Sequence, residues 1–437
     1  MSNWMGRSVR VALGVSLAAT MAGGCMTPAS ADRGAGVATA SDGYRLERVV
    51  FLMRHGIRPP TKDPAKGDNY ARDAWPGWTV DYGLLTTRGA EGIRLLGAAD
   101  RADYVRRGLL PASGCLPAGA IVAEASAKQR AIKTGEAYVE TLLPGCAVTV
   151  AHPEKEGPED WMFHPLDSGP ADFDGQRAYR ESAALAPAGG IAAQAAALRT
   201  EIDLLGNVLG CCSAPVCAAN NAAAACTLAD LPSSITANPH DRPDLAGPMS
   251  VGSTISQTFL LEYLEGMPMA DVGWGRISRD QIEQLLIFHP VKFRYENGSP
   301  YVARRAAGPL VTRMAEALDA GPGGPRFTLL FGHDTNLADV GSLLGISWKV
   351  ASYPKDDIPP GGALGFELLG DKAGHKFVRA FFRAQTMDQL RNQTPLDAQA
   401  EGYRSYLSIP GCNSPGDTTP CPIDRFKAIV KEKLTAS

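Results

Sequence analysis

The chain has 437 residues, of which 45% are apolar, and its formal net charge is −3 at pH 7. This length and composition allow one large or two modest domains around a sizeable core. Because the charge is nearly balanced, the composition gives no sign of a nucleic-acid-binding protein, and we expect no nucleic-acid partner.

The N-terminal 31 residues are typical of a targeting segment. Two arginines precede an apolar stretch over residues 11–22, which suits a signal peptide but is too short to span a bilayer. Ala-Ser-Ala at positions 29–31 then gives the small-x-small pattern at which such peptides are cleaved. We therefore predict a signal peptide over residues 1–31, cleaved after Ala31, and a periplasmic or secreted protein.

The first chemical motif follows a predicted strand over residues 49–53, Val-Val-Phe-Leu-Met, which runs into Arg54-His55-Gly56-Ile57-Arg58. Arginine forks match the geometry of phosphate oxygens, and histidine is one of the few side chains that can act as a nucleophile near neutral pH. His55 is therefore a candidate nucleophile between two oxyanion-binding arginines. The alternative is a surface turn in which Gly56 and the following prolines only punctuate the chain.

The middle of the chain changes character. Residues 83–108 are predicted to be helical, and residues 120–150 follow a strand–helix–strand pattern. From residue 152 to 290 there follow an alanine-rich helix over 191–205, a cysteine-containing loop and an amphipathic run over 250–266. These patterns predict an α/β catalytic core over residues 44–151 and 291–437, preceded by a mobile segment over 32–43, with residues 152–290 as a mostly helical cap insert.

A second motif follows another predicted strand, Phe-Thr-Leu-Leu-Phe over residues 327–331. Gly332-His333-Asp334 comes next and opens an apolar pattern at helical spacing. Because the carboxyl ends of parallel strands face one crevice, both motifs are expected to meet there. His333 can donate to the same oxyanion, and Asp334 can act as general acid and then as general base. Alternatively, Asp334 only caps the helix. Residues 363–368 and 377–382 alternate like neighbouring strands of the same sheet.

The chain holds nine cysteines, and eight remain if Cys25 is removed. An even number favours disulfides and an oxidising compartment. Lipoprotein processing at Cys25 is the alternative to cleavage after Ala31, and without it we expect no membrane attachment. Another four cysteines allow three pairings, of which Cys211–Cys226 with Cys212–Cys217 is our preference. A zinc site is disfavoured because two of the four are adjacent and no histidine is near.

The two motifs occur together with Pro59-Pro60-Thr61-Lys62, Leu85-Thr86-Thr87-Arg88-Gly89 and Gly273-Trp274-Gly275-Arg276-Ile277. In these residues the chain resembles the histidine acid phosphatases, branch 2 of the histidine phosphatase superfamily. It looks closest to the bacterial periplasmic acid phosphatase/phytases and glucose-1-phosphatases. The resemblance implies an α/β fold with a phosphoglycerate-mutase-like mixed sheet, flanked by helices and carrying a mostly helical inserted cap domain.

The resemblance also implies roles for single residues. His55 would become phosphohistidine, and Asp334 would be the proton donor. The phosphate-binding residues would be Arg54, Arg58, His333 and a third arginine, which counting back from Lys133-Thr134-Gly135-Glu136 places at Arg130.

Residues outside the phosphate site also have expected roles. Thr61 and Lys62 match positions that contact the rest of the substrate in phytase-like relatives. Some of those relatives carry a glutamate where this chain has Gln257, which leaves the leaving-group site open. The resemblance further implies the disulfides Cys115–Cys146 and Cys412–Cys421.

These observations predict metal-independent hydrolysis of phosphomonoesters, phytate or related phosphates, through a phosphohistidine at acidic pH. A protonated Asp334 and His333 would favour that pH. We expect a small-molecule phosphomonoester as substrate, no cofactor, no metal and a monomer. A glucose-1-phosphatase-like sugar phosphatase is the alternative within the family. A non-catalytic phosphosugar-binding protein is the alternative of another class, although a binder would need neither His55 nor Asp334. A phosphotransferase or mutase ranks below both.

Overall fold

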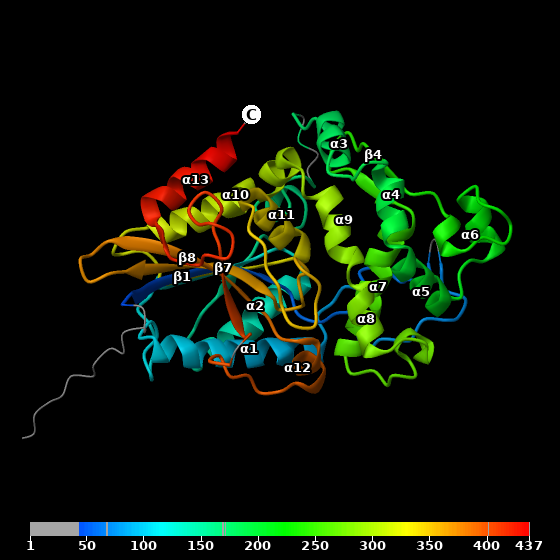
Figure 1. The fold of residues 1–437 in the computed structure, drawn as a ribbon. Helices are drawn as coiled ribbons and strands as arrows, with labels where there is room; N and C mark the ends of the chain where they lie inside the picture. Colours follow the sequence, from blue (N-terminus) through cyan, green and yellow to red (C-terminus); the bar gives the residue numbers. More distant parts are fainter. Residues whose placement is uncertain (1–42, 67–68, 168–169, 171, 401, 437) are drawn as a thin grey trace, which may run out of the picture. The chain divides into compact units, whose positions relative to one another are not determined.

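In the part of the chain that the structure describes, a mixed eight-stranded sheet forms the centre of an α/β fold (Figure 1). The strand order is β10-β8-β7-β1-β6-β2-β3, and β9 pairs with β8 beside this path. Neighbours from β1 to β3 are parallel, and the remaining pairs are antiparallel. The strands are β1 (Arg45–Arg54), β2 (Ile121–Ala125), β3 (Val150–Ala151), β6 (Phe327–Gly332), β7 (Ala363–Gly370), β8 (Lys376–Arg383), β9 (Arg404–Leu407) and β10 (Cys421–Pro422).

This computed structural model describes residues 43–66, 69–167, 170, 172–400 and 402–436. The predicted signal peptide, the lipidation alternative at Cys25 and nearly all of the segment over residues 32–43 lie outside the described residues. Within those ranges, no helix is both long enough and apolar enough to cross a membrane.

Helices cover both faces of the sheet because its central strands are apolar on both sides. Val50 and Leu52 of β1 belong to the apolar cluster that includes residues of α10, α11 and α13. Their neighbours Phe51 and Met53 belong to the cluster that includes residues of α1 and α2. Strand side chains alternate between faces, so one continuous apolar run contributes to two cores. The helices are α1 (Thr87–Arg106), α2 (Gln129–Leu142), α10 (Pro300–Asp319), α11 (Asp334–Leu344), α12 (Met387–Asn392) and α13 (Ile423–Thr435).

The strands and helices predicted for the core are present in the structure, but their first and last residues differ from the prediction. The predicted strands over 49–53, 327–331, 363–368 and 377–382 lie within β1, β6, β7 and β8. The helix predicted from residue 83 begins only at Thr87, because the Thr86 side chain accepts the backbone N–H of Gly89 and caps it there.

Residues 152–290 form mostly short helices with one small hairpin. The helix predicted over 191–205 is divided, since Leu198 ends α4 and precedes α5. The run predicted to be amphipathic is α7, whose side chains are buried almost all round because α5, α8 and α9 pack about it. The elements are η1 (Pro158–Asp160), α3 (Gly175–Ala183), α4 (Gly190–Ala197), α5 (Arg199–Leu209), α6 (Ala214–Ala219), η2 (Leu228–Asp230), β4 (Ser234–Thr236), β5 (Asp244–Ala246), α7 (Pro248–Leu264), η3 (Val272–Gly275), α8 (Arg279–Leu285) and α9 (Phe288–Glu296). The boundaries of a separate cap domain stay a prediction.

The described residues contain four disulfides. Cys115–Cys146 and Cys412–Cys421 are the pairs that the family resemblance implied. The preferred pairing in the loop after α5 was wrong, because the structure joins Cys211 to Cys212 and Cys217 to Cys226. Helix α6 brings the buried Cys217 to Cys226, whose backbone N–H lies 3.3 Å from the Cys217 sulfur. The two remaining cysteines, Cys211 and Cys212, are adjacent in the chain and form a disulfide with each other.

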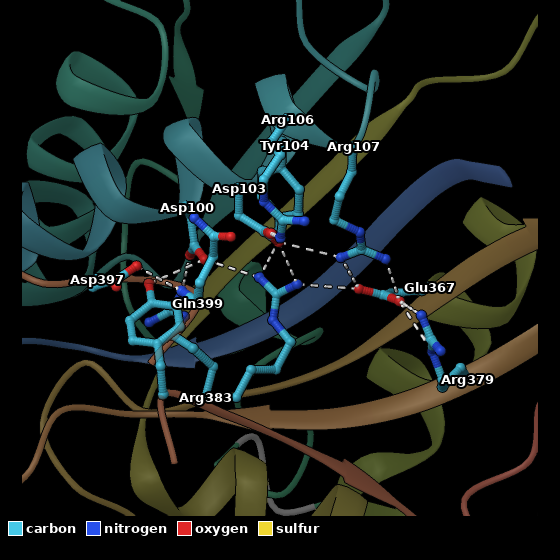
Figure 2. A network of polar contacts seen from close by, with 12 residues as sticks. Asp100, Asp103, Tyr104, Arg106, Arg107, Glu367, Arg379, Arg383, Asp397 and Gln399 are labelled. Atoms are coloured by element: carbon cyan, nitrogen blue, oxygen red, sulfur yellow. Dashed lines mark hydrogen bonds and ion pairs between the residues drawn. The ribbon is translucent and has the colours of Figure 1, made fainter. Parts of the chain in front are cut away.

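A buried ion network fastens α1 and the segment after it to the antiparallel half of the sheet (Figure 2). Arg107 and Arg379 approach the fully buried Glu367 of β7 from two sides, and Arg107 donates at 2.6 Å to one oxygen and 2.8 Å to the other. Arg404 of β9 bridges Glu367, Asp103 and Asp100 at 2.8 to 3.2 Å. Although burial alone would raise the pKa of Glu367, these arginines, Arg107 first, lower it to about 2. Its carboxylate is therefore fully compensated.

Candidate active site

The two sequence motifs meet at the carboxyl ends of β1 and β6. These strands are parallel neighbours, and their register places Arg54 opposite Gly332. The backbone N–H of His55 donates to the Gly332 carbonyl at 3.0 Å, and that of Arg54 donates to Gly362 at 2.9 Å. The histidine of the first motif is thus fixed by its backbone to the strand that leads directly into His333 and Asp334.

The His55 side chain is a buried, neutral imidazole with one nitrogen directed into the site. Its Nδ1 lies 2.8 Å from the carbonyl oxygen of Gly56, which can only accept, so Nδ1 carries the proton. The Nε2 atom keeps its lone pair and lies 3.4 Å from Nε of Arg58. Burial first, and then the charges of Arg58 and Arg130, hold the pKa of His55 well below its usual value. The Nε2 lone pair thus accepts a long hydrogen bond from Arg58, and a neutral nitrogen of this kind can attack phosphorus once that hydrogen bond is released.

Three arginines crowd around this nitrogen with few carboxylates to balance them. Arg54 is 1% exposed, and its Nη2 lies 2.8 Å from Asp334 and 3.0 Å from the side-chain oxygen of Gln257. Burial and the charge of Arg130 lower the pKa of Arg58 to about 9. Burial also lowers the pKa of Arg130. The Nε atoms of Arg54 and Arg130 are buried without a hydrogen-bond partner among the described residues. Such a cluster of buried donors suits a multiply charged oxyanion.

Arg130 reaches this cluster from the first turn of α2, and its Nη1 lies 3.4 Å from the carbonyl of Gly83. A Cβ atom built on Gly83 would lie 3.8 Å both from Arg130 Nη1 and from the Cα of Thr61. The loop that carries Thr61 and Lys62 therefore passes beside Arg130, and both of these side chains are exposed to solvent. Position and exposure leave them able to meet the outer part of a ligand.

His333 is oriented by a serine and an aspartate that sequence reasoning missed. Ser126 Oγ lies 2.7 Å from a carboxylate oxygen of Asp160, so its proton points there, and His333 Nε2 donates to Oγ at 3.1 Å. The opposite nitrogen, Nδ1, is buried and has no partner among the described residues. Burial, and then Arg130, lower the pKa of His333, whose ring centre lies 5.5 Å from that of His55. His333 is thus neutral until an anion approaches.

Asp334 is the first residue of α11, and the residue that caps the helix is His333, whose backbone N–H donates to Asn336. The reading of Asp334 as the cap was therefore wrong. One of its oxygens accepts the N–H of Thr335 at 3.0 Å, and the other faces Arg54. Burial alone would raise the pKa of Asp334, but Arg54, and then His289, hold it well below its usual range. In the free protein the predicted protonation of these two residues is disfavoured, because burial lowers the pKa of His333 and Arg54 lowers that of Asp334.

A buried pair behind Asp334 also had no signal in the sequence. His289 Nδ1 lies 2.6 Å from Asp357, and His289 Nε2 lies 3.7 Å from Asp334 Oδ2. The two partners come from α9 and from the loop before β7, 68 positions apart. Neither residue type nor spacing singles out His289 or Asp357, because only the folded chain brings them together.

Comparisons with known proteins agree with this geometry. The model of the histidine phosphatase superfamily (branch 2) matches residues 45–172 and 240–383. The chain is 34% identical over 423 residues to the phytase AppA of Escherichia coli, covering 93% of this chain and 95% of that protein. It is 30% identical over 405 residues to a glucose-1-phosphatase of Salmonella typhimurium, covering 90% and 93%. The solved Hafnia alvei phytase in complex with myo-inositol hexakis sulphate has a TM-score of 0.81 and 31% identity, covering 91% of this chain and 99% of that chain.

Proposed function

The chain belongs to the histidine phosphatase superfamily (branch 2) and is a phosphomonoester hydrolase, and we propose that it works through a phosphohistidine on His55. The observation that carries this proposal is the neutral His55 Nε2 facing a cluster of buried arginines, with the acid Asp334 beside them. Nucleophile, charge neutralisation and proton donor are the parts that phosphoryl transfer to a side chain needs.

In the first step, the phosphoryl oxygens accept hydrogen bonds from Arg54, Arg58 and Arg130. Their guanidinium groups, buried at Arg54 and half-buried at Arg58 and Arg130, neutralise charge that spreads over the oxygens in the transition state. His333 adds a donor through Nδ1 when it is protonated, and the arriving anion makes that protonation more favourable.

The His55 Nε2 lone pair then forms a bond to phosphorus while the bond from phosphorus to the leaving oxygen breaks. A protonated Asp334 gives its proton to that oxygen, and the alcohol departs. In the second step water attacks phosphorus, its proton passes to Asp334, and the P–N bond electrons return to His55. Phosphate leaves with the starting groups restored. Because Asp334 is a carboxylate beside Arg54 in the free protein, its proton arrives as the phosphoryl group takes over that arginine. This requirement favours acidic pH.

For the substrate, we propose phytate or a related inositol phosphate, with glucose 1-phosphate as the second candidate. The identity is higher to the phytase of Escherichia coli than to the glucose-1-phosphatase of Salmonella typhimurium. The exposed Thr61 and Lys62 beside Arg130 offer further polar contacts for a ring that carries several phosphates. Gln257 accepts a hydrogen bond from Arg54, and by the family resemblance it takes the place of a glutamate of some phytase-like members, so the leaving-group side of the site stays open.

We further propose an exported monomer that needs no metal. The four disulfides among the described residues support an oxidising compartment, and the cleavage after Ala31 belongs to the same proposal. Arginine and histidine provide the charge neutralisation that metal ions supply in other phosphatases.

The test is phosphate release at acidic pH, in the presence of a chelator, from phytate, glucose 1-phosphate and p-nitrophenyl phosphate in parallel. Release from phytate that vanishes in His55→Ala supports the proposal. A strong preference for glucose 1-phosphate would replace the proposed substrate. No release from any substrate would favour a binding protein, and loss in chelator that zinc restores would contradict metal independence.

A further inference from the structure

His289 and Asp357 form a buried pair directly behind the acid of the site. Their side chains are 6% and 0% exposed, and His289 Nδ1 lies 2.6 Å from Asp357 Oδ1. Because an ionised carboxylate only accepts hydrogen bonds, Nδ1 carries a proton and the opposite nitrogen, Nε2, faces Asp334 at 3.7 Å. The ring of Phe293, 4.4 Å away between centres, packs against the imidazole and fixes its orientation.

Asp334 needs a second partner because Arg54, its partner in this structure, is also a proposed ligand of the phosphoryl group. In the structure its Oδ2 pairs with Arg54 at 2.8 Å. The same Arg54 also has a side-chain bond to Gln257 and is a proposed donor to the phosphoryl oxygens. When a phosphoryl group occupies Arg54, the carboxyl group of Asp334 requires support from elsewhere. Among the described residues, His289 is the other ionisable side chain that forms an ion-pair contact with it.

We propose that His289, held by Asp357, is a positioning residue for Asp334. It supports the carboxyl group while Arg54 serves the phosphoryl group. Because its two nitrogens face the carboxylates of Asp357 and Asp334, the proposal includes a proton on each nitrogen. The resulting positive charge stabilises the carboxylate left after the proton of Asp334 has moved to the leaving oxygen. The atoms balance as in the proposed mechanism, since His289 keeps its own protons throughout. This inference rests on the proposed function and assigns a role to two residues outside the phosphate-binding set.

The groups that face the pair come from several elements. Asp334 of α11 and Asp357 flank the imidazole, and Arg54 of β1 lies beyond Asp334. The buried Tyr353 is close enough to Asp357 for that carboxylate to raise its pKa, after burial itself. Loss of the positive charge next to Asp334 therefore leaves Arg54 as the remaining nearby cation in direct contact with the carboxylate.

Two substitutions at His289 distinguish the hydrogen-bonding support of Asp334 from the effect of the positive charge beside it. His289→Asn keeps an amide near Asp357 but removes the group that faces Asp334, whereas His289→Gln can place an uncharged N–H near that position. For His289→Asn we expect kcat on an alkyl phosphate to fall about 10- to 100-fold, the usual effect of removing an outer-shell partner. We also expect the alkaline limb of the pH profile of kcat to shift to higher pH by about one unit or more. The reason is that Asp334 keeps its proton to higher pH when the neighbouring positive charge is removed.

His289→Gln is expected to recover much of the turnover, while the alkaline limb of its kcat profile stays at the higher pH. Asp357→Asn is expected to shift this limb in the same direction by a smaller amount. The loss should be larger with glycerol phosphate than with p-nitrophenyl phosphate, because nitrophenolate leaves with little help from an acid. A structural role alone would lower turnover on both substrates equally and leave the limb in place, and that result would overturn the proposal.

His375→Asn is the matched control. His375 also pairs with an aspartate, Asp371, at 2.9 Å, but it is 73% exposed. Its substitution should leave both pH limbs unchanged. The wild-type protein in the same assay separates this test from that of the proposed function. Wild-type hydrolysis with an unchanged profile in His289→Asn contradicts only the inference, whereas absence of wild-type hydrolysis contradicts the function itself.

Discussion

Two clusters of arginines in the described part of the chain are balanced by carboxylates to different degrees. In the network between α1 and the antiparallel strands, burial opposes the charge of Arg107 and Arg404, but their partners raise the pKa of both. For Arg107 the main partner is Glu367, and for Arg404 Tyr104 comes first, followed by three carboxylates. Around His55, burial and then the neighbouring Arg130 lower the pKa of Arg58 to about 9, although Asp334 opposes them. Buried charge is tolerated when it is paired. We therefore infer that the network stabilises the fold, whereas the arginines around His55 form the proposed binding site for the phosphoryl group.

The largest test of this difference is His55→Ala. Removal of the proposed nucleophile should lower kcat by several orders of magnitude, because residues that act as one unit in catalysis lose most of their effect together. Unfolding temperature should change little, since the network that holds the sheet is untouched. Phosphate release and thermal unfolding of the same preparation check this, and near-normal turnover would remove His55 from the mechanism.

Asp334→Asn should lower kcat by about 10²- to 10⁴-fold, the range for general acid–base catalysis. The loss should be greatest with alkyl phosphates, whose leaving oxygen needs the proton most. Steady-state kinetics on glycerol phosphate and p-nitrophenyl phosphate measures it. An equal loss on both substrates would show that the carboxylate serves only to hold Arg54.

Glu367→Gln tests the other cluster. The change leaves Arg107, Arg379 and Arg404 without their common carboxylate and should cost about 3–5 kcal/mol of unfolding free energy, as breaking a buried pair usually does. At temperatures where the variant is folded, kcat should stay near the wild-type value. Glu140→Gln is the control, because Glu140 pairs with Arg94 on the surface and is 60% exposed. Such a pair contributes about 0–1 kcal/mol.

The smallest expected effect is the pH dependence of the difference in unfolding free energy between the wild-type protein and Glu367→Gln. The pKa of Glu367 is lowered from 4.5 to about 2 in the folded protein, so its stabilisation is complete above the unfolded value and is lost as pH falls toward the folded one. Denaturant unfolding of wild-type protein and Glu367→Gln should therefore converge as pH falls through this window. A constant gap between them would contradict the assignment of a paired carboxylate.

The sequence predicted those parts of the site that are carried by local patterns. His55 and His333 each follow a buried apolar run, and parallel pairing of the two runs brings them together. The partners that orient them had no such signal. Ser126 and Asp160 are 34 positions apart, and His289 and Asp357 are 68 apart. Their meeting depends on tertiary packing, which residue types and spacing do not encode.

The charge states of the site and the disulfide pairing also depend on tertiary packing, which sequence patterns do not reveal. The motif identified Asp334 as an acid, but its pKa depends on how closely Arg54 and His289 approach it in the folded chain. The pairing of Cys217 with Cys226 depends on the course of α6 and the loop after it. The fold class and the meeting of His55 with His333 could thus be predicted, whereas the contacts that Asp334 makes with Arg54 and His289 required the structure.

The most direct test of the account is to trap the covalent intermediate. Wild-type protein would be mixed with radiolabelled substrate, quenched rapidly under alkaline denaturing conditions that preserve phosphohistidine, digested and mapped. The account predicts label on the peptide that contains His55, and none on that peptide in His55→Ala. Label on a different residue, or turnover with no trapped label at any time, would contradict a phosphohistidine at His55.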